Sequence, residues 1–487
     1  MKKIASIMSF LLLLLIYIFT KDYNMFLLTL SFSMFIIYNG IFSTMSIKKI
    51  LEKLYDKKYY YSINRIFKYS VLFLLVIMLF IMLISYLISL LINIQGLGVV
   101  NISMCIYLLM NIIIRLESEY LSIIKNKKIG DNLVYIYNII SSILQFIMVF
   151  LLYKVFDLDN YINISILYIV GIIPFVIFNV LIYIFVFKNK NISKKREESK
   201  IKFVKEIKNS LIGDKTVIAF NMIQGSYIYL TIVILYFILI NKYNYDYDKA
   251  GVYITYIYFY GTAMVYYIYR IIKIIYGNKF NEIKEKIRNK ENYNLINFIN
   301  KVVSLLISLT ILLIIISKPL NNILFNNKDI NIILNVSYVL IFYIMYDLII
   351  NINILCNKSK NVIITLFIGL FVCLITSVPI IDTSYRMGYS LVGGSIVSII
   401  LGLTISIIIG IILMKKKLKL SILNNFNDIL NMIYENIIYA LVLVLFTFII
   451  KVNISGVVRS ILVIVFYIFV TIVFYIIKEK LANKKVQ

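Results

Sequence analysis

About fourteen apolar stretches run along this chain, and nearly all are close to the ~20 residues that an α-helix needs to cross the ~30 Å hydrocarbon layer of a membrane. Their predicted bounds are 4–20, 25–47, 70–92, 99–124, 133–153, 164–187, 217–240, 252–276, 302–316, 332–355, 362–381, 389–414, 433–450 and 457–477. The chain is also 62% hydrophobic, which is far outside the range of soluble domains. The sequence therefore predicts an all-α polytopic membrane protein.

The connecting loops alternate between lysine-rich and lysine-poor. About 40 of the 50 Lys and Arg residues fall on one side of the membrane and about nine on the other, which is the asymmetry that marks cytoplasmic loops. This predicts a multi-pass protein of a bacterial-type cytoplasmic membrane with both termini in the cytoplasm, whose first span is not cleaved. The net charge of +27 then lies mostly on the cytoplasmic face, where membrane lipid headgroups rather than nucleic acid are the expected partners.

The composition also narrows the chemistry. The chain has no histidine, and its three cysteines, Cys105, Cys356 and Cys373, lie in or at the end of predicted spans. A histidine-ligated metal, a histidine base and a disulfide framework are therefore excluded, and no cofactor is expected. The longest predicted external loop is 317–331, which is too short for the large external loop that membrane polymerases and glycosyltransferases usually carry.

An internal repeat predicts the domain organisation. One constant offset along the chain carries Asn126-Lys127 onto Asn357-Lys358 and Lys188 onto Lys419. The alternative is a chance match among loops that are all rich in lysine. An even number of spans in each repeat makes the repeats parallel. We therefore predict an N-terminal lobe of six spans (1–187), a basic cytoplasmic linker (188–214), a C-terminal lobe of six spans (215–419), and an appended pair of spans with a cytoplasmic tail (420–487).

Ionisable groups within spans are candidates for function, because each one is costly to place in the hydrocarbon layer. Arg115 lies in the fourth span, one helical turn beyond Asn111, and Asp347 lies in the tenth, with Asn351 one turn on. Arg115 and Asp347 fall at similar depths in equivalent spans. They could therefore meet across the lobes. The alternative is that each has a separate partner within its own lobe, or that the Arg115 side chain snorkels to the membrane surface. A short carboxylate cannot snorkel far, so Asp347, with Asn351, is the candidate for coupling or gating. Arg115 is a candidate for substrate binding.

Three segments resemble a known family. They are 39–46 followed by the start of a helix at 64–67, the segment 318–325 with Pro319, and the small residues Gly388 and 393–397. They resemble corresponding segments of the multidrug/oligosaccharidyl-lipid/polysaccharide (MOP) exporters, most closely the polysaccharide-biosynthesis and stage V sporulation B-type branch. Departures are the absence of the family's glycine in the segment 115–119 and Met45 in place of a small residue.

The resemblance implies a MATE-like fold in which the first, second, seventh and eighth helices line a cavity between the lobes. Lys215, Arg270 and Lys273 would then be contacts for a pyrophosphate, or cations at the interface that reinforce topology. Asn39 and Ser43 would meet sugar hydroxyls, or serve close helix packing. Pro174 and Pro379 are expected to kink the sixth and eleventh spans.

The function that this implies is a flippase without covalent chemistry. It would move an isoprenoid-pyrophosphate saccharide from the cytoplasmic to the outer leaflet by alternating access, with the glycosyltransferases and polymerase of polysaccharide assembly as further candidate partners. The first alternative is a cation-coupled exporter of small molecules such as drugs on the same fold. That function needs a carboxylate in the N-terminal lobe, and the first, second, third, fifth and sixth spans have none. The second alternative is a membrane polysaccharide polymerase.

Overall fold

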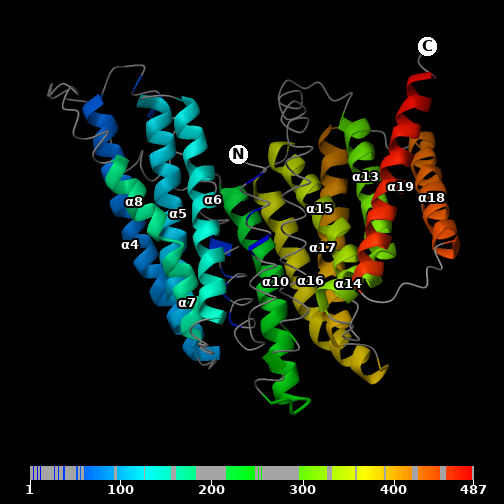
Figure 1. Cartoon of the computed structure of the whole chain (residues 1–487), viewed down its shortest axis with the longest axis horizontal. Coiled ribbons are helices and arrows are strands. Elements are labelled where there is room, and N and C mark those ends of the chain that lie inside the picture. Colours follow the sequence, from blue (N-terminus) through cyan, green and yellow to red (C-terminus); the bar gives the residue numbers. More distant parts are fainter. Residues whose placement is uncertain are drawn as a thin grey trace. The chain divides into compact units, whose positions relative to one another are not determined.

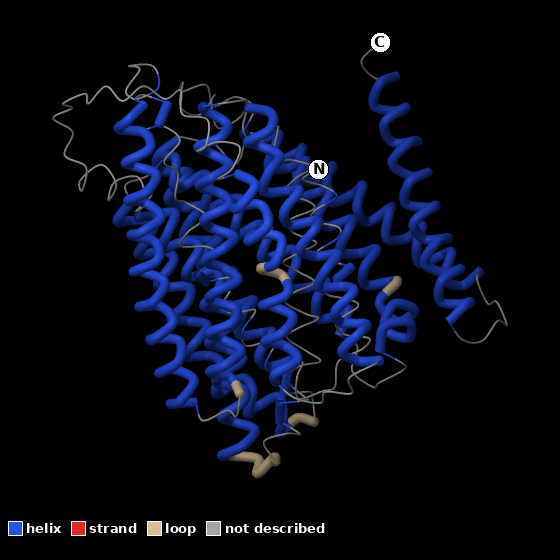
Figure 2. The backbone as a smooth tube through the Cα atoms, turned by 60° about the vertical axis from the view of Figure 1, so that its left-hand side comes forward, coloured by secondary structure: helices blue, strands red, loops and turns tan. Residues whose placement is uncertain are grey.

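The computed structural model describes residues 60–92, 96–124, 127–154, 161–182, 215–246, 295–325, 332–356, 359–388, 391–418, 426–449 and 457–484, with scattered positions among 4–55 and at 250, 251 and 254. Within this described part every regular element is a helix (Figure 2). Eight of the described helices are long and apolar enough to cross a membrane, or nine if one bent pair is counted as a single span. The predicted all-α membrane fold is therefore confirmed.

Helices occupy the described parts of the predicted third to seventh and ninth to fourteenth spans. The first, second and eighth predicted spans lie mostly outside the described residues, so the total of fourteen stays a prediction. The chain divides into two compact units, residues 1–255 and 256–487. The first unit includes the predicted seventh span, whereas the repeat assigns that span to the second lobe. The lobe boundaries derived from the repeat also stay a prediction.

Six described helices make up the first unit (Figure 1): α4 (Tyr60–Ile92), α5 (Leu97–Ile124), α6 (Lys127–Lys154), α7 (Tyr161–Val170), α8 (Ile173–Ile182) and α10 (Lys215–Asn241). Helix α5 is central, because it packs against α4, α6 and α7. The turn from α4 to α5 contains Gly96 with φ of 77°, a conformation that glycine adopts without strain. Gly98 then allows close approach of the two helices, since a Cβ at this position would lie 2.9 Å from the Ser89 Oγ.

Scattered positions in the predicted second span follow one helical face. Leu27, Ser31 and Met34 are helical and buried, and Tyr38 is helical and half-buried, so the spacing fits one side of a helix. The Ser31 Oγ lies 3.1 Å from the Tyr168 Oη of α7, and the Tyr38 Oη lies 2.8 Å from the Ser85 Oγ of α4. These hydroxyl pairs join described positions of the second span to α7 and α4.

The sixth predicted span is broken just before Pro174, as expected for a residue that lacks a backbone N–H. Helix α7 ends at Val170 and α8 begins at Ile173. The break is stabilised by side chains of α6. The Tyr137 hydroxyl and the Ser141 hydroxyl each donate a hydrogen bond of 3.0 Å to the Gly171 carbonyl, and the Gln145 amide donates one of 3.0 Å to the Leu167 carbonyl. Buried backbone at the break therefore finds partners within the protein.

Seven helices make up the described second unit: α13 (Leu295–Ile315), α14 (Ser317–Phe325), α15 (Ile332–Cys356), α16 (Ser359–Arg386), α17 (Leu391–Leu418), α18 (Phe426–Ile449) and α19 (Val457–Lys484). Helix α17 packs along α16 and also against α15. Gly394 of α17 lies against the backbone of α16, since a Cβ there would lie 2.8 Å from the Ile381 Cα. Helix α16 continues through Pro379 without a break, unlike the span that contains Pro174.

The expectation of an external loop at 317–331 was wrong for its first part. Residues 317–325 form helix α14, which is bent by 57° from the preceding α13. Pro319 lies in the first turn of α14, where a proline has no N–H bond to lose. Helix α14 is part of the packed structure, because it contacts both α15 and α19.

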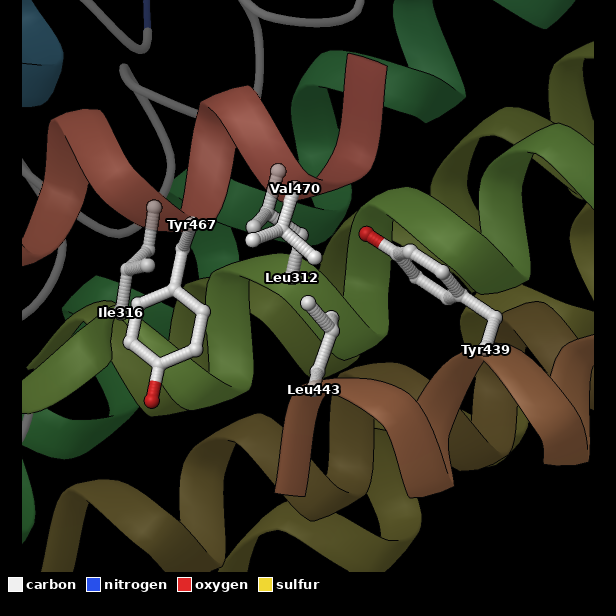
Figure 3. Packing of buried hydrophobic residues seen from close by; sticks show 6 residues of the cluster. All are labelled: Leu312, Ile316, Tyr439, Leu443, Tyr467 and Val470. Carbon is white, nitrogen blue, oxygen red and sulfur yellow. The ribbon is translucent and has the colours of Figure 1, made fainter. Parts of the chain in front are cut away.

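The C-terminal helices α18 and α19 pack on α13 through a cluster of six buried apolar residues (Figure 3). Its members come from α13, α18, α19 and the turn after α13, and are Leu312, Ile316, Tyr439, Leu443, Tyr467 and Val470. Polar contacts orient the packing. The Ser308 hydroxyl donates to the Asn436 Oδ1 at 2.7 Å, and the Asn436 amide donates to the Ser304 Oγ at 3.2 Å. The appended pair predicted from the sequence is thus docked on the second unit.

We expect Tyr137→Phe and Ser141→Ala to be strongly non-additive, because either hydroxyl alone can satisfy the Gly171 carbonyl. Each single substitution should cost little, whereas the double substitution should lower the free energy of unfolding by about 1–3 kcal/mol, the cost of an unpaired buried group. Chemical unfolding of the purified protein in detergent measures this cycle. Ser226→Ala is the control, since Ser226 bonds only within α10, to the Met222 carbonyl. Additive single effects would contradict the shared-acceptor interpretation.

Candidate functional site

Helix α15 carries the predicted coupling residue of the second unit at its centre. This helix is the most buried described span of the unit. In its most apolar part 61% of the residues are buried, against 11% to 44% for the other described spans of the unit. Asp347 on it is only 2% exposed. A carboxyl group at this position is surrounded by protein rather than by the lipid tails, which is where functional charges of membrane proteins are found.

Asparagine side chains extend the polar part of α15 toward its end. The Asn351 amide donates a hydrogen bond of 2.7 Å to the backbone carbonyl of Asp347, one turn earlier. The Asn353 amide is buried and donates to two carbonyls at 2.9 Å, that of Ile349 in its own helix and that of Gly410 in α17. Gly410 makes this approach feasible, because a Cβ there would lie 2.7 Å from the Ile349 Cγ2. Asn353 thus fixes the helix that positions Asp347.

Arg115, the predicted partner of Asp347, lies on α5 in the first unit and is half-buried. Asn111, one turn before it, donates its amide to the Tyr107 carbonyl of the same helix at 3.1 Å. Since Arg115 and Asp347 belong to different units, a contact between them stays a prediction. The polar residues of α5 and α15 nevertheless lie on the helix that is most buried in each unit.

Of the remaining predicted site residues, Lys215 alone lies in the described part of the chain. Lys215 begins α10, as expected for the opening of the seventh span. Four residues lie outside the described part of the chain: Asn39, Ser43, Arg270 and Lys273. Their assignment to a pyrophosphate or to sugar hydroxyls therefore stays a prediction.

The sequence reasoning missed Glu117. This residue lies within the α5 span Leu97–Ile123, is 5% exposed, and has a carboxyl oxygen, Oε2, that makes no hydrogen bond. Its signal was present in the sequence, as an acidic residue inside an apolar stretch, but the segment 115–119 was used only for comparison with a family motif. The sequence argument against a carboxylate in the N-terminal lobe covered every span of that lobe except the one that contains Glu117.

Metal binding by a cluster of ligands has no support in the described part of the chain. No group of three or more His, Cys, Asp or Glu side chains comes together among those residues. Two of the cysteines, Cys105 on α5 and Cys373 on α16, are buried in different units. Asp347 and Glu117 are the carboxyl groups that are buried in the described spans, one on α15 and one on α5.

The fold is that of known membrane transporters. The structure of the lipid II flippase MurJ in an inward closed conformation matches with a TM-score of 0.60 and 15% identity, over 99% of this chain and 98% of that chain. A multidrug resistance MATE family transporter of the MOP superfamily, in an inward-facing conformation, matches with a TM-score of 0.57 and 11% identity, over 86% and 95%. A MOP superfamily transporter from Pyrococcus furiosus matches with a TM-score of 0.53 and 10% identity, over 86% and 94%.

No protein-family model and no curated protein sequence matches the chain. At identities of 10% to 15% the structural likenesses define the fold, which is shared by MurJ and the MATE transporters and confirms the MATE-like fold expected from the sequence. The finer resemblance to the polysaccharide-biosynthesis and stage V sporulation B-type branch stays a prediction. Substrate and mechanism have to be argued from the residues of this chain.

Asn353→Leu should lower the free energy of unfolding by about 0.6–1.7 kcal/mol, the range measured for hydrogen bonds between membrane helices. The matched control is Asn351→Leu, since the Asn351 amide bonds to a carbonyl of its own helix and its loss leaves the contact between α15 and α17 intact. Unfolding in detergent of the two variants measures the difference. Equal losses would show that the bond to Gly410 does not hold the two helices together.

Proposed function

We propose that this protein is a flippase for a lipid-linked saccharide. It moves an isoprenoid-pyrophosphate saccharide from the cytoplasmic to the outer leaflet of a bacterial-type cytoplasmic membrane. The headgroup crosses the membrane by alternating access while the isoprenoid tail stays in the bilayer. Both termini lie in the cytoplasm, and no covalent chemistry takes place.

The observation that carries this proposal is the extent of the structural likeness. The lipid II flippase matches 99% of the chain with a TM-score of 0.60, whereas the multidrug transporter matches 86% with a TM-score of 0.57. The multidrug transporter therefore leaves part of this chain without a counterpart, and the flippase leaves almost none. A flippase of a lipid-linked saccharide thus accounts for more of this chain than a multidrug exporter does.

The charges of the chain fit an anionic headgroup. Lys215 at the start of α10, together with Arg270 and Lys273, supplies cations suited to a pyrophosphate, because arginine binds phosphate oxygens with two parallel bonds and lysine acts as a point charge. Asn39 and Ser43 supply hydrogen bonds for sugar hydroxyls. Asp347, with Asn351, supplies a buried carboxyl that responds to a coupling ion or biases a gate.

The alternative is a cation-coupled exporter of small molecules such as drugs. The buried Asp347 and the likeness to a multidrug transporter favour it. Glu117 favours it as well, since it supplies the carboxyl in the N-terminal lobe that this function needs. A polysaccharide polymerase is the weaker alternative, since the segment predicted as the longest external loop is largely occupied by helix α14. Glycosyltransferases of the same pathway are candidate partners of the proposed flippase.

The test is transport in proteoliposomes that contain a fluorescent polyprenyl-pyrophosphate saccharide, followed with a membrane-impermeant quencher. The wild-type protein should make the labelled lipid of the inner leaflet accessible. Asp347→Asn should slow this movement by about tenfold or more, which corresponds to ~1.4 kcal/mol in the barrier. The matched control is Asp382→Asn, which removes a carboxylate from the Asp382–Arg386 ion pair of 2.9 Å at the end of α16.

The control variant should transport at the wild-type rate. A wild-type protein that leaves the labelled lipid in place but expels a cationic dye from the same vesicles would overturn the flippase proposal in favour of the small-molecule exporter. Equal rates for Asp347→Asn and Asp382→Asn would remove Asp347 from the mechanism while leaving the flippase proposal intact.

A further inference from the structure

Glu117 is a buried carboxyl that the proposed function does not yet use. It lies seven residues before the end of α5, about 10 Å from that end at 1.5 Å per residue. Its side chain is 5% exposed, and its Oε2 has no hydrogen-bond partner. An ionised carboxylate in such a position is strongly disfavoured unless a positive group or a proton compensates its charge.

The side of α5 that carries Glu117 is apolar. Residues three and four positions away on a helix share its side, and here these are Ile113, Ile114, Tyr120 and Leu121, all buried. The Tyr120 ring packs against Phe67 of α4, with ring centroids 4.8 Å apart. Arg115 lies two positions earlier and therefore about 200° around the helix, on the opposite side. The nearest cation in the sequence is thus directed away from the carboxyl.

Described titratable groups on the helices next to α5 contact residues other than Glu117 or are exposed. On α4, Arg65 lies over the Tyr69 ring at 5.5 Å, and Lys68 is exposed. On α6, Tyr137 donates to the Gly171 carbonyl, and on α7, Tyr168 bonds to Ser31. Helix α8 has no titratable residue. Among these described groups, the phenol of Tyr120 alone shares the side of Glu117.

The second unit has a carboxyl in a matching position. The repeat offset that carries Asn126 onto Asn357 also carries Glu117 onto Leu348, the neighbour of Asp347. Asp347 lies nine residues before the end of α15, and Glu117 lies seven residues before the end of α5. Each of the two helices is the most buried described span of its unit: α5 is 67% buried over its most apolar window, against 17% to 59% for the others of unit 1. Among the described residues, each unit thus has one buried carboxyl, at a similar depth in its central helix.

We propose that Glu117 is a proton-binding site of the first unit and that proton movement through it drives transport. The inference rests on the proposed function and supplies its driving force. A proton from the outer side forms the O–H bond of the Glu117 carboxyl, which neutralises the buried charge. The bond breaks when the unit opens to the cytoplasm and the proton is released there. No electron is transferred and no other bond changes.

A proton fits this position better than a metal cation. Metal cations in proteins take several oxygen ligands at once, and no group of three or more acidic, cysteine or histidine side chains comes together in the described part of the chain. The carboxyl of Glu117 offers one oxygen without a hydrogen bond, in apolar surroundings. A single proton removes the charge of that carboxyl, which is the most costly part of its burial.

The experiment compares Glu117→Gln, Glu117→Asp and the control Glu119→Gln in proteoliposomes with the fluorescent polyprenyl-pyrophosphate saccharide and an imposed pH gradient. Glutamine has the shape of the protonated acid but cannot release a proton, and Glu119 is a half-buried acid on the same helix. The gradient should accelerate wild-type transport, with acidification of the proton-receiving compartment reported by pyranine. Glu117→Gln should lose this acceleration by about tenfold, within the usual range of coupling between sites.

Glu117→Asp should keep part of the acceleration and Glu119→Gln all of it, while the unfolding temperature of Glu117→Gln should match or exceed that of the wild type. Acceleration that persists in Glu117→Gln overturns the proposal. Wild-type transport that ignores the gradient also overturns it and leaves the flippase standing. If the wild type moves no saccharide, the proposed function fails. Infrared spectroscopy of the purified protein then decides for Glu117. A component of the protonated-carboxyl band that is missing only from Glu117→Gln supports the site, and a band that is unchanged in Glu117→Gln overturns it.

Discussion

Polar groups inside the hydrocarbon layer must find their partners within the protein, and this requirement explains how both units are built. Where Pro174 interrupts a span, α6 supplies three side-chain donors to the carbonyls of Leu167 and Gly171. Where α15 meets α17, the Asn353 amide reaches the Gly410 carbonyl, and the glycine makes room for it. Irregular backbone and buried amides thus occur where a neighbouring helix satisfies them.

The carboxyls of Glu117 and Asp347 are the groups to which this requirement applies most severely, because burying a charge is far more costly than burying an amide. Both lie on the central helix of their unit, away from lipid. Residues that are so costly to bury are retained where they serve a function. A flippase that couples headgroup movement to proton binding would use such a pair, with one carboxyl in each half of the protein.

Much of the fold could be predicted from the sequence, because hydrophobic length alone defines a membrane span. The described helices follow the predicted spans at α4 to α6, α10, α13 and α15 to α19. The break before Pro174 was predictable from the chemistry of proline, whereas α16 runs through Pro379 unbroken. Helix α14 was missed because a short polar segment with a proline also has the composition of a loop. Glu117 could have been found from the sequence in the same way as Asp347, as an acid inside an apolar span, but its burial and its oxygen without a hydrogen bond could not.

The sequence by itself determined the class of protein and the candidates Arg115 and Asp347, because these follow from local hydrophobicity and charge. The membrane topology inferred from the lysine-rich loops stays a prediction. Only the tertiary structure decided which helices are central, which amides bridge neighbouring helices and which carboxyl lacks a hydrogen bond. These properties depend on contacts between segments far apart in the chain. The hydrophobic periodicity and the composition of a segment describe one helix at a time, so they do not predict which residues of other helices will contact each of its sides.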